Sequence, residues 1–185
     1  MTLAIVIGSE GQDGRILFER LSQSGVDAIG IGRDRARSSN GQHVEWFDVT
    51  DRSAVMTMLN RFQPDSIYYL AAVHGSSQAG TSSGDAELFA RSGRVHVDGV
   101  VNMLEWLALN KSGSLFYAAS SLVFGNPESE PQTEVTPFKP ESPYAITKTS
   151  GIHACRYFRD LYNVNVSAGI LYNHESPLRG EPFVS

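Results

Sequence analysis

The N-terminal stretch constrains the fold of this chain more than any other feature. An apolar run, Leu3–Ile7, is followed at once by the glycine-rich segment Gly8-Ser-Glu-Gly-Gln-Asp-Gly14, and apolar residues then recur at helical spacing. Glycines between a strand and a helix let the backbone approach a pyrophosphate, which the N–H groups at the helix start can bind. The segment therefore predicts a dinucleotide-binding loop with five contacting residues, Gly8, Gly11, Gln12, Asp13 and Gly14.

The rest of the chain alternates β-rich and helical segments, a pattern typical of a parallel sheet between helices. We predict further strands at Ala28–Ile31, His43–Phe47, Ser66–Leu70, Ser114–Ala119 and Val164–Ile170. We predict helices at Gly14–Ser24, Arg52–Phe62, Ala86–Leu109 and Pro143–Tyr162, the third of which can split or bend at Gly93 and Gly99. The fold class is α/β, a Rossmann-like doubly wound parallel sheet with helices on both faces. Its ligand crevice should lie at the carboxyl ends of the strands.

The composition fits one soluble globular domain and excludes several function classes. The chain has 185 residues, of which 41% are hydrophobic and 19% charged, and its net charge is −5, so no nucleic-acid footprint is indicated. No stretch approaches the roughly 20 apolar residues that cross a bilayer. The single Cys155 and the scattered histidines show no metal-ligand spacing, so we expect no metal site. We expect a cytoplasmic protein.

The end of the second predicted strand bears on the form of the coenzyme. It reads Ile29-Gly-Ile-Gly-Arg33, and an arginine at this point accommodates the 2′-phosphate of NADP, whereas an acidic residue would bind the ribose hydroxyls of NAD. Asp34 lies next to it. We therefore predict NADP as the cofactor, with NAD as the alternative.

The ends of the next two strands supply further candidate cofactor contacts. Asp48 can accept the adenine amino group, or it can instead cap the helix that begins near Asp51. Small residues follow the fourth strand and would let the adenosine half of the cofactor lie against the backbone, so we expect contacts at Leu70, Ala71 and Ala72.

Tyr144 and Lys148 lie one helical turn apart and share one helix face. A neighbouring ammonium favours the phenolate, so we expect Lys148 to move the pKa of Tyr144 toward neutral pH. The tyrosine can then serve as general acid or base for a hydroxyl. Ser120 ends the fifth predicted strand and can hydrogen-bond the same hydroxyl, while Lys148 holds the nicotinamide ribose. We predict Ser120, Tyr144 and Lys148 as the catalytic group, the last two also contacting cofactor.

Together these features resemble the extended short-chain dehydrogenase/reductases that modify nucleotide sugars, the nucleotide-sugar epimerase and dehydratase family. Among them, the sequence is most similar to the GDP-mannose 4,6-dehydratases. The segments that carry the resemblance are GSEGQDG, FDVTD, YYLAA, VHVDGVVNMLEWL and SPYAITK, and the most specific is the tail ILYNHESPLRGEPFV. The family carries a smaller C-terminal substrate domain, so we expect residues 1–185 to be its NADP-binding domain, with the substrate domain absent or truncated.

The resemblance also implies a reaction and further contacts. In the family the tyrosine removes the sugar O4 proton as a hydride passes from C4 to NADP, water leaves across C5 and C6, and the hydride returns from the reduced coenzyme to C6. Additional cofactor contacts fall on Val49, His74, His174 and Arg179, and substrate contacts are expected at Ser121 and Asn173. The resemblance further implies a GDP-linked substrate and a homodimer or homotetramer, in which the apolar residues of 97–109 could pair by analogy.

Two positions depart from the dehydratase pattern. Leu122 stands where the dehydratases have a glutamate that handles the C5 proton and the C6 hydroxyl, and Leu178 replaces an arginine. Without a positioned acid/base, elimination should be slower by about 10² to 10⁴, unless Glu128, Glu130 or Glu134 intervenes. Leu122 therefore favours a reductase or epimerase activity, whereas the resemblance of the Asn173 to Val184 segment favours a dehydratase activity. The alternative from another class is a non-catalytic NADP-binding sensor or assembly protein.

Overall fold

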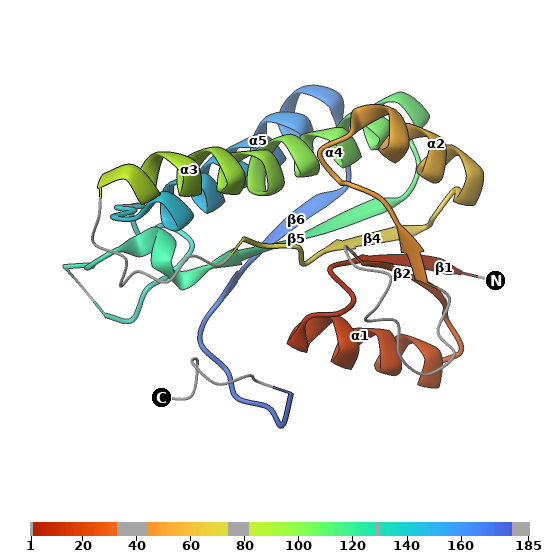
Figure 1. Cartoon of the computed structure of the whole chain (residues 1–185), viewed down its shortest axis with the longest axis horizontal. Helices are drawn as coiled ribbons and strands as arrows, with labels where there is room; N and C mark the ends of the chain where they lie inside the picture. The colour runs from red at the N-terminus through yellow and green to blue at the C-terminus, as the bar shows by residue number, and fades with distance from the viewer. Residues whose placement is uncertain (1, 33–43, 74–81, 129, 179–185) are drawn as a thin grey trace.

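The computed structural model describes residues 2–32, 44–73, 82–128 and 130–178. Within these residues, six parallel strands form one sheet in the order β3-β2-β1-β4-β5-β6 (Figure 1). The strands are β1 Leu3–Ile7, β2 Asp27–Gly32, β3 Val44–Trp46, β4 Ser66–Tyr69, β5 Ser114–Ser120 and β6 Val166–Leu171. This order is that of a dinucleotide-binding doubly wound sheet, so the predicted fold class is confirmed.

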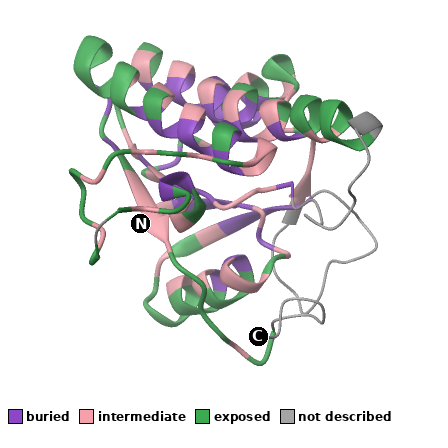
Figure 2. Cartoon of the chain, turned by 90° about the vertical axis from the view of Figure 1, so that its left-hand side faces the viewer, coloured by how far each residue is buried: buried purple, intermediate pink, exposed green. Residues whose placement is uncertain are grey.

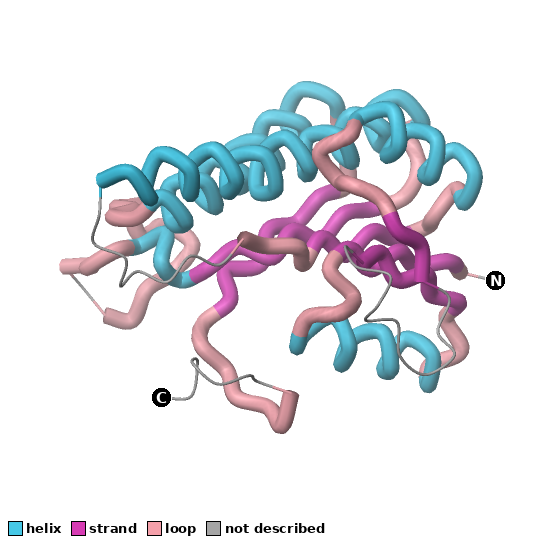
Figure 3. The backbone as a smooth tube through the Cα atoms, viewed as in Figure 1, coloured by secondary structure: helices cyan, strands magenta, loops and turns pink. Residues whose placement is uncertain are grey.

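Helices cover both faces of the sheet. The helices are α1 Gln12–Gln23, α2 Arg52–Phe62, α3 Ser82–Gly93, α4 Gly99–Asn110 and α5 Pro143–Tyr162. Helix α1 lies below the strands in the view of Figure 3, and the other four lie above them. The helix predicted at Ala86–Leu109 is divided near the two expected glycines, because a π-helical turn, Arg94–Asp98, joins α3 to α4.

The core lies between the sheet and the upper helices. Figure 2 shows buried residues in the strands and in the helices packed on them. Alternate residues of the strands, such as Ile5, Ile67 and Leu115, point into one cluster with Leu104 and Trp106 of α4. Burying a side chain of this size contributes about 1.5–3 kcal/mol, so this cluster fixes α4 on the sheet.

The chain reverses its strand order between β1 and β4, and the loops after these two strands pack together. The backbone N–H of Leu70 donates to Ile7 O at 2.9 Å. Gly8 has a φ of +85°, and a Cβ there would lie 2.9 Å from Ala71 N, so only glycine fits. Ligands of such sheets bind at this reversal, on the carboxyl side of the strands.

Candidate active site

Ser120, Tyr144 and Lys148 gather at the carboxyl end of β5. Ser120 is the last residue of β5, and Tyr144 hydrogen-bonds to it. Ser142 caps α5 by accepting from Ala145 N at 3.2 Å, and α5 begins at Pro143, so Tyr144 lies in the first turn of the helix. The predicted serine–tyrosine–lysine group is thus assembled from two elements.

Lys148 is buried and hydrogen-bonded on the sheet side of α5. Its Nζ donates to Ala118 O at 2.7 Å and lies 5.8 Å from the centre of the Tyr144 ring. It also lies 5.0 Å from the centre of the Tyr117 ring. Burial disfavours the charged ammonium and lowers the pKa of Lys148 to about 7.

We predicted that Lys148 moves the pKa of Tyr144 toward neutral pH, and this prediction is wrong. Burial raises the pKa of Tyr144 above its ordinary value, and the hydrogen bond from Ser120 opposes this rise. Spacing along the helix correctly indicated that Lys148 is near, but it could not show that both groups lose water. Because an amine with a pKa of about 7 is only partly charged at neutral pH, its pull on the phenolate is weak.

The glycine loop presents an uncapped helix start. Helix α1 has Gly11 as its N-cap residue with no side-chain cap, whereas Asp51 caps α2 and Ser142 caps α5. The first N–H groups of a helix have no intrahelical partner and carry the positive end of the helix dipole. The backbone at Gln12 and Asp13 therefore suits a phosphate group, and the loop fits the pyrophosphate of a dinucleotide.

The segment after β6 closes on this loop. Nε2 of His174 lies 2.7 Å from Oδ1 of Asp13, and its Nδ1 lies 2.8 Å from Tyr172 O. The Gln12 amide donates to His174 O at 3.4 Å. Figure 1 shows the segment on the α1 side of the sheet. The structure therefore brings His174 to the predicted cofactor loop.

Glu10 lies beside the end of β2, the point at which the sequence predicts a contact with the coenzyme ribose. A Cβ on Gly32 would lie 2.9 Å from Cδ and 3.0 Å from Oε2 of Glu10, so the carboxylate rests against Gly32. The sequence did not indicate this residue, because Glu10 meets Gly32 only through the packing of the glycine loop against β2 in the folded chain. The N–H groups of Gly8 and Ser9 make that contact by donating to Ile31 O.

The two explanations of Asp48 are separated by its hydrogen bonds. Asp51, not Asp48, caps α2 by accepting from Ala54 N at 3.1 Å, so the capping alternative for Asp48 is wrong. Asp48 Oδ1 instead accepts from Thr50 N at 2.9 Å and closes the preceding turn. Val49 is half-buried, and its carbonyl accepts from the Asn102 amide.

Leu122 and the three glutamates named beside it lie in the 3-10 turn and the loop that follow β5. Leu122 follows Ser120 in a 3-10 turn, Ser121–Phe124, and its side chain is 55% exposed. Glu128 pairs with Lys139 at 2.5 Å, which holds the pKa of that carboxyl below its usual range and makes it a poor proton donor at neutral pH. Glu130 and Glu134 are exposed on the same loop.

For several predicted contact residues the structure gives only the location in the fold. Leu70, Ala71 and Ala72 follow β4 beside the glycine loop, Ser121 begins the 3-10 turn, and Asn173 is exposed beside His174. Arg33, His74 and Arg179 lie outside the described residues. Among the described residues, no group of three His, Cys, Asp or Glu side chains could hold a metal. None of the helices described has both the length and the apolar character to cross a membrane.

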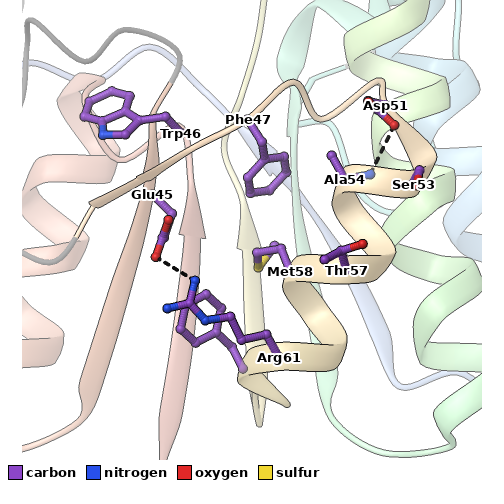
Figure 4. A pocket seen from close by; sticks show the side chains of 10 residues that line it. Glu45, Trp46, Phe47, Asp51, Ser53, Ala54, Thr57, Met58 and Arg61 are labelled. Carbon is purple, nitrogen blue, oxygen red and sulfur yellow. Dashed lines mark hydrogen bonds and ion pairs between the residues drawn. The ribbon is translucent and has the colours of Figure 1, made fainter.

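A groove of about 440 Å³ lies between β3 and α2 (Figure 4). Trp46, Phe47 and Met58 line it, and Arg61 pairs with Glu45 across its end at 3.4 Å. None of the three catalytic candidates contributes to it. We assign it no part in the chemistry.

A Rossmann-like sheet with this serine–tyrosine–lysine group defines an extended short-chain dehydrogenase/reductase. Comparison with known sequences narrows the class: the family model described as GDP-mannose 4,6 dehydratase matches residues 5–185, so the chain belongs to this family. The GDP-mannose 4,6-dehydratase of Vibrio cholerae is 33% identical over 199 residues, which cover 99% of this chain and 52% of that protein. That of Sinorhizobium fredii is also 33% identical, covering 99% and 56%.

Solved structures support the fold. The UDP-glucose 4-epimerase of Brucella ovis, in complex with NAD, has a TM-score of 0.78 at 18% identity, over 91% of this chain and 51% of that one. The Bordetella bronchiseptica enzyme WbmH, in complex with NAD⁺, has a TM-score of 0.81 at 20% identity, over 97% and 58%. The chain thus spans about half the length of the relatives it matches.

Proposed function

We propose that this protein is a nicotinamide-dependent nucleotide-sugar enzyme that oxidises or reduces a sugar at C4. The observation that carries the proposal is the Ser120–Tyr144–Lys148 group at the carboxyl end of β5, on the edge of the sheet that also carries the glycine loop. A nicotinamide coenzyme, when bound, would supply the hydride acceptor or donor. Tyr144 would take or give the proton of the C4 hydroxyl, Ser120 would orient that hydroxyl, and Lys148 would hold the nicotinamide ribose.

Leu122 favours a reductase or epimerase over a 4,6-dehydratase. Elimination of water needs a second acid/base near C5 and C6, and an exposed leucine beside Ser120 cannot move a proton. Membership of the dehydratase family favours a GDP-linked sugar as substrate.

Incubation of the purified protein with GDP-mannose and NADP⁺ separates the two reactions. We expect little or no 4-keto-6-deoxy product after trapping with borohydride. Rapid formation of that product would show that another group replaces the glutamate and would overturn the reductase or epimerase assignment.

For the coenzyme we propose NADP, because Arg33 follows Gly32 at the end of β2. The carboxylate of Glu10 opposes this preference, since it lies against Gly32 and would accept from ribose hydroxyls. Dissociation constants for NADPH and NADH, measured by quenching of protein fluorescence, test the assignment. Tighter binding of NADH would contradict it.

The second candidate function is a binding protein that holds the dinucleotide without turnover. The intact proton-transfer group disfavours it, because a sensor needs no such group. Tyr144→Phe should lower kcat by about 10² to 10⁴ and leave the dissociation constant of NADPH unchanged. Wild-type turnover in that variant would remove Tyr144 from the mechanism.

We also propose a homo-oligomer, by analogy with the family. Most apolar side chains of 97–109 pack into the chain's own core, Met103 and Leu107 among them, so they are not free for pairing as expected. On α5, in contrast, Ile146, Tyr157 and Leu161 are exposed. Sedimentation of the wild type and of a Tyr157→Lys, Leu161→Lys double variant tests α5 as the contact.

A further inference from the structure

His96 lies in the π-helical turn Arg94–Asp98 and is fully buried against the catalytic helix. The turn interrupts the regular hydrogen bonding of the long helix. Tyrosine hydroxyls from the sheet bond its carbonyl groups: Tyr69 donates to Val95 O at 2.6 Å, and Tyr117 donates to His96 O at 3.2 Å. The π-helical turn is therefore anchored to β4 and β5, and His96 has a fixed position.

Both ring nitrogens of His96 take part in one directional chain of hydrogen bonds. Nε2 lies 3.0 Å from Val73 N, and because the backbone N–H can only donate, Nε2 carries no proton. Nδ1 then carries the ring proton and donates to Thr147 Oγ1 at 2.8 Å. The threonine hydroxyl donates in turn to Pro143 O or Tyr144 O, at 2.9 and 3.0 Å.

This chain joins the loop after β4 to the first turn of α5. Val73 directly follows the predicted cofactor contacts at 70–72, and Tyr144 is the proposed acid/base. The His96 ring also meets the Tyr144 ring edge to face, with centres 5.1 Å apart and planes at 85°. The tyrosine ring is thus restrained from the side of His96 and held by Ser120 through its hydroxyl.

We propose that His96 is a positioning residue for Tyr144, acting through Thr147 to hold the phenol on Ser120 and in register with the loop after β4. The inference rests on the proposed function of Tyr144. Loss of the chain would let the first turn of α5 move, and a displacement of about 1 Å can cost about 10²-fold in rate.

Thr147→Val is the central test, with Thr149→Val as its matched control. Both threonines are buried on α5 and bond a carbonyl four residues earlier, but only Thr147 contacts His96. His96→Phe keeps an aromatic ring and removes both hydrogen bonds. Thermal unfolding of each variant shows whether it folds. If His96→Phe does not fold, Thr147→Val alone tests the positioning role of His96.

The readout is the ionisation of Tyr144, followed by ultraviolet difference absorbance and isolated by subtracting the same variant with Tyr144→Phe. The other groups facing this phenol, Lys148, Tyr117 and Ser120, are unchanged in every variant. Because the Ser120 hydrogen bond lowers the pKa of Tyr144, its loss should move the titration of Tyr144 to higher pH in Thr147→Val but not in Thr149→Val.

Equal titration curves for the two threonine variants would overturn the inference. So would an equal loss of kcat in both, because that loss would reflect only a missing buried hydroxyl. A shifted titration in a protein that turns over no nucleotide sugar would instead refute the proposed function and leave the positioning role in place.

Discussion

The His174–Asp13 contact, with Nε2 and Oδ1 2.7 Å apart, ties the segment after the last strand to the first turn of the first helix. Both nitrogens of His174 face acceptor oxygens, a carboxylate and the Tyr172 carbonyl, which a protonated imidazole satisfies with two donated hydrogen bonds. The segment after β6 and the first turn of α1 thereby meet at the predicted pyrophosphate loop.

Breaking this contact should weaken coenzyme binding. In His174→Phe the segment 172–178 loses its hold on the glycine loop, so we expect the dissociation constant of NADPH to rise about three- to tenfold, a loss of about 1 kcal/mol, as for one hydrogen bond. Fluorescence titration measures it. Asp13→Asn should show the same effect, whereas Glu19→Gln, a change to an exposed carboxylate on the same helix, should not. An unchanged constant in both contact variants would exclude the segment from coenzyme binding.

Glu10 should set part of the preference between the two coenzymes. Its carboxylate lies against Gly32, where a 2′-phosphate would meet a negative charge and a 2′-hydroxyl would meet an acceptor. In Glu10→Gln we expect the ratio of NADPH affinity to NADH affinity to rise about tenfold, which corresponds to about 1.4 kcal/mol. Fluorescence or calorimetric titration with both coenzymes gives the ratio. A ratio equal to that of the wild type would mean that the carboxylate does not face the ribose.

The sequence predicted the elements of the fold well because each has a local signature. The alternation of apolar strands and helical periodicity identified the six described strands and the regions of the five α-helices within a few residues, and Gly93 and Gly99 marked the division between α3 and α4. The π-helical turn between them was not predicted. It depends on hydroxyls of Tyr69 and Tyr117, which come from strands distant in the sequence.

The sequence pointed to three residues, Ser120, Tyr144 and Lys148, that the structure brings together, but it did not predict their electrostatics. The Tyr144 and Lys148 spacing placed both on one helix face, yet burial raises one pKa and lowers the other, which no local pattern records. The contacts of His96 were not predicted for the same reason, because Val73 and Thr147 lie 23 and 51 residues away along the chain. In both cases the missing information was the packing of α5 on the sheet.

The depressed pKa of Lys148 should make stability depend on pH. In the folded chain the pKa is about 7, below the ordinary value of 10.5, so above pH 7 the unfolded state binds more protons at this residue than the folded state. The contribution of Lys148 to the free energy of unfolding therefore rises with pH between about 7 and 10, by at most about 1.4 kcal/mol per pH unit.

Lys148→Met removes this dependence. Urea unfolding of the wild type and the variant can be measured at about pH 7, 8 and 9, within this window. The free energy of unfolding of the wild type should rise relative to that of the variant as the pH increases. Taking the difference cancels the ionisation of Cys155 and the buried tyrosines, whose pKa values burial raises. A difference independent of pH would show that Lys148 stays charged in the folded chain.

Gly151 should be required for the close packing of α5 on the π-helical turn. A Cβ at this position would lie 2.7 Å from His96 O and meet the Tyr117 hydroxyl more closely still, so Gly151→Ala must push α5 away from the sheet. Overpacking of this kind typically costs about 1–3 kcal/mol, so we expect the melting temperature to fall by roughly 2–10 °C. Gly93→Ala is the matched control, since Gly93 ends α3 with no atom within 4 Å of an added Cβ. It should be neutral or stabilise the chain by up to about 1 kcal/mol, because alanine favours the helix. Equal melting temperatures for the two alanine variants, measured by circular dichroism, would show that α5 is not held at the distance the structure gives.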